Sequence, residues 1–111
     1  MLKELTEQYI EAFDSKDLTK CAEIFTDDFA LEDPVVKRIE GKVEVLKAIK
    51  SIFDSCDSLS FEAKNIYQDG QTTIIEFVLK LDGTTLTGID IIEWKDNKMK
   101  ELRAYLDVPK G

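Results

Sequence analysis

The chain has 111 residues, 43% of them hydrophobic and 34% charged, which is the size and balance of one globular domain spanning residues 1–111. Its net charge of −8 argues against a nucleic acid or an anionic membrane surface as partner, because both require a basic protein face. The absence of histidine removes histidine-dependent catalytic triads and the commonest metal ligand.

The first part of the chain predicts two helices. Apolar residues recur at helical spacing over residues 2–14, and Asp17 is placed to cap a second helix that we expect to end at Asp27 or Asp28. The N-terminal segment contains acidic residues, unlike a signal peptide, and no apolar run is long enough for a membrane span. We therefore expect a cytoplasmic protein that does not contact the membrane.

A short strand, Phe29–Leu31, follows and leads into Glu32-Asp33-Pro34. Pro34 disfavours the helical conformation at Asp33, and alternation along an extended chain sends the two acidic side chains to opposite faces. An acid that points inward from a strand end is a candidate general base. The plainer interpretation is a polar turn after a strand.

The rest of the chain predicts a third helix and then a sheet. Residues 35–40 read as a short extended segment, Gly41 breaks it, and residues 42–55 have helical periodicity. After Asp57 the period becomes two, with tight turns near residues 69–70, 82–83 and 95–98, which predicts four long antiparallel strands. The fold class is therefore α+β: a curved antiparallel sheet wrapped around three helices, enclosing a cone-shaped apolar interior.

Two features inside these elements bear on chemistry. Asp90 is surrounded by isoleucines in a strand, where a surface or turn acid is unusual, so we expect it to be buried. Gly88, two residues earlier, leaves room for a ligand or for a closely approaching backbone. Cys21 and Cys56 lie in apolar helical registers and are expected to be reduced core thiols, with no metal site.

Several motifs occur in an order that resembles a known superfamily. They are Tyr9-Ile-Glu-Ala-Phe-Asp14, Asp27-Asp-Phe-Ala-Leu-Glu-Asp-Pro34, Gly41, Gly88-Ile-Asp90 and Arg103-Ala-Tyr105. From about Leu5 to Leu106 the chain is similar to the nuclear transport factor 2-like, or SnoaL-like, superfamily, and in particular to its ketosteroid isomerase branch. The resemblance implies a cystatin-like roll of three N-terminal helices and a curved sheet.

The resemblance also implies a function and three catalytic residues. Ketosteroid isomerases shift a double bond in a hydrophobic ketone by proton transfer through an enolate, without a cofactor or metal. Asp33 matches their general base, while Tyr9 and a protonated Asp90 match the two donors to the enolate oxygen. Phe25 and Ile49 stand where that family has two further tyrosines that support the tyrosine donor, which implies a weaker oxyanion hole. The substrate need not be a steroid.

We expect an apolar pocket that binds a hydrophobic small molecule. The lining residues that we predict are Phe13, Phe25, Ile49, Phe53, Phe77, Gly88, Leu102, Ala104 and Leu106. Leu106 replaces the aromatic residue that closes the pocket in the family, and Asp107, beside the expected pocket mouth, is an alternative acid.

Two other functions are compatible with the sequence. One is a polyketide cyclase of the SnoaL-like type, which the lack of histidine disfavours. The other is a non-catalytic module that binds a small apolar molecule. The protein is also expected to form a homodimer through the outer face of the sheet, where Ile74, Val78, Ile89 and Ile91 would otherwise be exposed.

Overall fold

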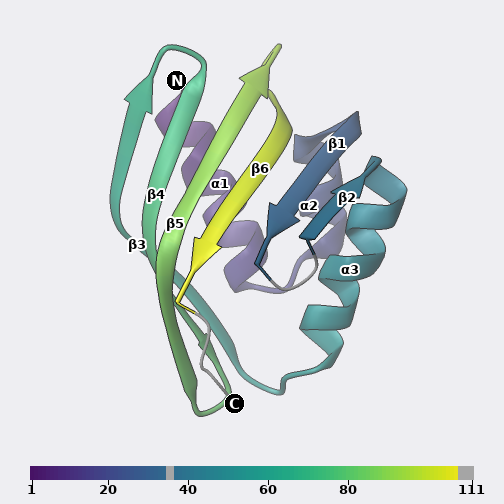
Figure 1. Cartoon of the computed structure of the whole chain (residues 1–111), viewed down its shortest axis with the longest axis vertical. Helices are drawn as coiled ribbons and strands as arrows, with labels where there is room; N and C mark the ends of the chain where they lie inside the picture. Colours follow the sequence, from purple (N-terminus) through teal and green to yellow (C-terminus); the bar gives the residue numbers. More distant parts are fainter. Residues whose placement is uncertain (35–36, 108–111) are drawn as a thin grey trace.

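The computed structural model describes residues 1–34 and 37–107 (Figure 1). The described elements, in chain order, are α1 (Leu2–Asp14), α2 (Leu18–Ile24), β1 (Phe25–Asp33), β2 (Lys37–Glu40), α3 (Lys42–Asp54), β3 (Leu59–Asp69), β4 (Thr72–Leu81), β5 (Thr84–Lys95) and β6 (Lys98–Leu106). The period change predicted after Asp57 therefore marks the transition from the last helix to the four long strands. Val35 and Val36, part of the extended segment predicted over residues 35–40, lie outside the described residues.

The six described strands form one curved sheet in the order β2-β1-β6-β5-β4-β3. Neighbouring strands are antiparallel except for β1 and β6, which are parallel. The helices lie on the concave side, so the predicted α+β cone is confirmed (Figure 1). The expectation of an antiparallel sheet does not hold for one pair: β1 pairs antiparallel with β2, its successor in the sequence, and parallel with β6, the last strand of the sheet.

The second helix is shorter, and the strand after it longer, than the sequence suggested. Helix α2 ends at Ile24, and Phe25 is already extended, with φ −89° and ψ 144°. Phe25 pairs with Met99 of β6, and its ring stacks on Phe29 with 4.0 Å between ring centroids. Pairing with a distant strand and burial of both rings thus override the local helical periodicity that predicted an end at Asp27 or Asp28.

Helix α1 is held against the sheet at both ends by hydrogen bonds. Near its start, the buried hydroxyl groups of Thr6 and Thr73 lie 2.8 Å apart, and the indole N–H of Trp94 donates to Thr73. At its end, the Asp14 carboxylate accepts a hydrogen bond from the backbone N–H of Phe61 on β3. The middle of α1 therefore has a fixed position above the concave face of the sheet.

Candidate active site

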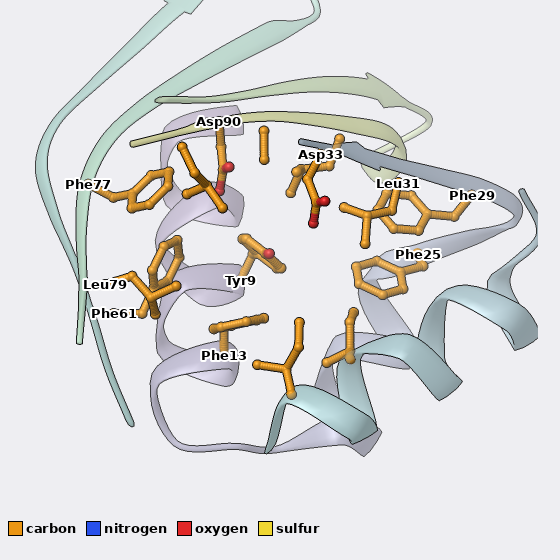
Figure 2. Close-up of a pocket in the computed structure, with 15 residues that line it drawn as sticks. Tyr9, Phe13, Phe25, Phe29, Leu31, Asp33, Phe61, Phe77, Leu79 and Asp90 are labelled. Atoms are coloured by element: carbon orange, nitrogen blue, oxygen red, sulfur yellow. The ribbon is translucent and has the colours of Figure 1, made fainter. Parts of the chain in front are cut away.

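The concave side of the sheet and the helices enclose a cavity of about 80 Å³ (Figure 2). It is lined by fifteen described residues: Tyr9, Phe13, Phe25, Phe29, Leu31, Asp33, Ile49, Ile52, Phe61, Phe77, Leu79, Asp90, Leu102, Ala104 and Leu106. Among these, two acids and one tyrosine are polar, and none is basic. The cavity therefore combines an apolar wall with three groups that can donate or accept a proton.

The three predicted catalytic residues reach this one cavity from different elements. Tyr9 comes from the middle of α1, Asp33 from the last position of β1 and Asp90 from the middle of β5. Figure 2 shows both carboxyl groups directed into the cavity from the sheet, with the Tyr9 ring between them and the helices. The cavity therefore brings together three side chains that are far apart in the sequence.

Asp90 lies in an apolar environment. Its side chain is 4% exposed, and its cross-strand neighbours are Ile75 of β4 and Ala104 of β6. Removing a carboxylate from water disfavours its charged form. Burial raises the pKa of Asp90 to about 8, and the nearby Asp33 carboxylate contributes in the same direction. Asp90 therefore holds its proton at neutral pH and can donate a hydrogen bond.

Tyr9 is buried at the centre of the aromatic side chains. Its ring centroid lies 6.1 Å from those of Phe13 and Phe61 and 6.4 Å from that of Phe25. Burial raises the pKa of its hydroxyl well above the ordinary tyrosine value, and Asp90 adds to this shift. The hydroxyl is therefore a hydrogen-bond donor to the cavity and not a phenolate.

Asp33 is half-buried and lies at the edge of the cavity. It also borders a surface hollow lined by Pro34, Lys37 and Tyr105, so it stands between the interior and solvent. The preceding Glu32 points to the other face of the sheet, where it forms an ion pair with Arg38 at 3.2 Å. Of the two adjacent acids, the one held before proline is the one that faces inward.

Seven of the predicted lining residues line the cavity, and two do not. Phe53 is buried behind the wall, with its ring 5.1 Å from that of Phe13. At Gly88 a Cβ would lie 2.3 Å from the carbonyl oxygen of Tyr105 and 3.0 Å from the Phe77 ring. The prediction was wrong for Phe53 and Gly88: the glycine admits a close backbone and a ring, and not a ligand. The alternative acid Asp107 is exposed and does not line the cavity.

Five lining residues were not predicted. Four of them are detectable by strand alternation, because Leu31 and Phe29 share a face with Asp33, and Phe61 is paired with Leu79 on the buried face of β3 and β4. The fifth, Ile52, lies three residues after Ile49 and so on the same face of α3.

The comparisons with known proteins identify the family. The SnoaL-like domain matches residues 6–102, which is most of the chain. The chain belongs to the SnoaL-like domain family. A search of curated protein sequences found no relative of this SnoaL-like protein.

Solved structures share the fold of this SnoaL-like chain. A candidate ketosteroid isomerase from Kribbella flavida is 16% identical, with a TM-score of 0.86 over 99% of this chain and 80% of its own. A candidate SnoaL-like polyketide cyclase from Jannaschia sp. CCS1 is 15% identical, with a TM-score of 0.84 over 96% and 85%. A protein of ketosteroid isomerase-like fold from Catenulispora acidiphila, solved in complex with trimethylamine, is 12% identical, with a TM-score of 0.82 over 92% and 84%. At these identities the likeness establishes the fold alone.

Two further features of the described residues are relevant. No helix in residues 1–34 or 37–107 is both long and apolar enough to cross a bilayer. Within the same residues, no cluster of three or more acidic, cysteine or histidine side chains is arranged to hold a metal ion.

Proposed function

We propose that this SnoaL-like domain is an isomerase that shifts a double bond in a hydrophobic ketone through an enolate. One observation carries the proposal: Tyr9, Asp33 and Asp90 line the same, otherwise apolar cavity. The reaction needs a base that removes a carbon-bound proton and donors that stabilise the resulting enolate oxygen. The cavity contains groups suited to both tasks.

Asp33 acts as the base in this proposal. Its carboxylate removes the proton from the carbon between the carbonyl group and the double bond of a β,γ-unsaturated ketone, and the electron pair of the broken C–H bond delocalises onto the carbonyl oxygen. The protonated Asp33 then returns the proton to the γ-carbon. The double bond becomes conjugated with the carbonyl, and the carboxylate is regenerated, so the step needs no further reactant.

Tyr9 and Asp90 stabilise the enolate in this proposal. Both groups hold a proton at neutral pH, because burial raises the pKa of each. Each can therefore donate a hydrogen bond to the developing negative charge. Were Asp90 ionised, it would repel both the enolate oxygen and Asp33. Preorganised donors of this kind typically contribute about 10²–10³-fold to a rate each.

The structural neighbours support this class of function without identifying a substrate. They include a candidate isomerase and a candidate cyclase, and one of them holds a small organic molecule. We favour the isomerase over the cyclase and over a purely binding module, because three groups that can donate or accept a proton would be costly in an apolar cavity that served binding alone.

The test of the proposal is Asp33→Asn, assayed for turnover of a β,γ-unsaturated ketone. Asparagine keeps the shape of the side chain but cannot accept the proton, so the rate should fall by about 10²–10⁴-fold. Glu32→Gln is the matched control, since Glu32 is the adjacent acid on the opposite face of β1. Equal rates for wild type and Asp33→Asn, with both proteins folded by thermal melting, would remove Asp33 from the mechanism.

Two assignments complete the proposal. Ile74, Val78, Ile89 and Ile91 on the outer face of the sheet are only half-buried in one chain, which supports a homodimer through that face. Sedimentation analysis should then give twice the mass of one chain, and a monomer at all concentrations would reject the dimer.

A cytoplasmic location stays a prediction, which fractionation of the native cells would test.

A further inference from the structure

The cavity is small for a binding site. Its volume is about 80 Å³, whereas an apolar protein cavity of about 150 Å³ holds one benzene ring, and pockets for drug-sized ligands measure about 300–1,000 Å³. A ligand that places an oxygen near Tyr9 and Asp90 therefore has room for at most one ring inside the protein.

Ring-to-ring contacts leave no space for a larger ligand in the interior. The centroids of Phe13 and Phe61 are 5.1 Å apart, as are those of Phe61 and Phe77. On the other side of Tyr9, the Phe25 and Phe29 rings stack at 4.0 Å. These are distances of direct aromatic contact, so no ligand ring can lie between these rings.

The deep end of the cavity is closed. Ile49 is 3% exposed, Leu102 2%, and Phe25 and Phe29 1% each. The lining residues that are only half-buried are Asp33, Ile52, Ala104 and Leu106, which form the open end. A long ligand could extend only past these residues into solvent, where its additional apolar surface would gain little from burial.

From these dimensions we infer that the substrate is a compact, uncharged ketone with one ring, of the size of cyclohex-3-enone, and that a four-ring steroid is a poor ligand. This inference rests on the isomerase function proposed above. The absence of a basic side chain among the described lining residues disfavours a substrate with a carboxylate, because that carboxylate would find no basic partner in the cavity wall and would lie near two acidic side chains. Ile52, at the open end, is the residue that we assign to limiting the length of the ligand.

The experiment compares two inert phenols, whose oxygen imitates that of the enolate. 4-Methylphenol has one ring and estradiol has four, and isothermal titration calorimetry measures both dissociation constants. We expect the dissociation constant of estradiol to be at least tenfold higher. Apolar area alone would favour estradiol, so equal or tighter binding of estradiol would overturn the size limit. Absence of binding by 4-methylphenol would overturn it as well.

A matched pair of variants tests the assigned residue. Ile52→Ala shortens a side chain at the open end of the cavity, while Leu46→Ala shortens an aliphatic side chain of α3 that is also half-buried but does not line the cavity. Ile52→Ala should lower the dissociation constant of estradiol at least threefold, and Leu46→Ala should leave it unchanged. An equal effect of the two variants would remove Ile52 from this role.

Turnover of cyclohex-3-enone separates the size limit from the proposed function. Preferred binding of 4-methylphenol together with no turnover would reject the isomerase and keep the limit on ligand size. Turnover of cyclohex-3-enone together with preferred binding of estradiol would keep the isomerase and reject the size limit.

Discussion

The two faces of strand β5 shift the pKa values of their acidic side chains in opposite directions. Asp90 faces the cavity, where burial raises the pKa of its carboxyl to about 8. Glu93, three residues later on the outer face, has a pKa below the ordinary glutamate value, because it accepts hydrogen bonds from Thr72 and Arg103. The difference is set by what surrounds each carboxyl and not by the residue type.

The outer face carries a chain of ion pairs across four strands. Arg38 of β2 lies 3.2 Å from Glu32 of β1 and 3.2 Å from Glu101 of β6. Arg103 of β6 lies 2.6 Å from the other carboxylate oxygen of Glu101 and 2.8 Å from Glu93 of β5. Each of these acids has a basic partner, whereas the cavity offers Asp90 none among its described lining residues.

Under the proposed function, Asp90 is the position at which this protein gives up stability for chemistry. A carboxyl without a basic partner is costly to ionise in an apolar cavity, so it keeps a proton that it can donate. Substitutions at Asp90 and among the outer acids should separate these two environments, with the largest effect expected at Asp90.

Replacing Asp90 should affect the rate far more than replacing its counterpart on the outer face. Asp90→Leu removes one donor to the enolate oxygen, so turnover of a β,γ-unsaturated ketone should fall about 10²–10³-fold with the fold intact. Glu93→Gln, on the same strand, should leave the rate within about twofold of wild type. If both variants lost activity equally, Asp90 would have no special role in the oxyanion site.

Asp90 should also make the protein less stable as the pH rises. The unfolded carboxyl titrates near 3.8 and the folded one near 8, so between these values the folded state binds more protons. Stability should therefore fall across this range, by up to about 1.4 kcal/mol per pH unit from Asp90. Asp90→Asn should remove this slope and be more stable than wild type at pH 7, as measured by urea unfolding from pH 4 to 8. Parallel curves for the two proteins would contradict the buried neutral acid.

The outer ion pairs should give a smaller effect of opposite sign. Arg103→Met removes the partner of Glu93 and Glu101, whose pKa values are both lowered in the folded protein. Its cost should be about 1 kcal/mol or less at pH 7, because these half-buried pairs are still reached and screened by solvent, and should diminish in 1 M salt. Since these acids have pKa values below the ordinary value of 4.5, the cost should diminish as the pH falls from 4.5 through the folded-state pKa of each acid. A cost that persisted unchanged in acid would point to lost packing and not to lost charge.

The sequence was sufficient for the elements and for the residues that reach the cavity by alternation. Asp90 could be recognised because isoleucines surround it, and Asp33 because Pro34 holds it extended. Both inferences use local patterns, which a strand preserves whatever it pairs with.

The contacts between distant segments could not be predicted in the same way. The parallel pairing of β1 with β6 places Phe25 beside Met99, and nothing near Phe25 in sequence records that pairing. The need for a glycine at position 88 also arises from distant segments, because the carbonyl of Tyr105 and the Phe77 ring that approach it come from two other strands. The small volume of the cavity likewise depends on how rings from separate elements pack.

The central claim, that the cavity holds a neutral acid opposite Asp33, is tested most directly by NMR titration of the side-chain carboxyl carbons of Asp90 and Glu93. In one sample, Asp90 should titrate near pH 8 and Glu93 below its ordinary value of 4.5. An Asp90 midpoint near 3.8, alongside that of Glu93, would show that Asp90 is ionised at neutral pH, and the assignment of Asp90 as an oxyanion donor would then be wrong.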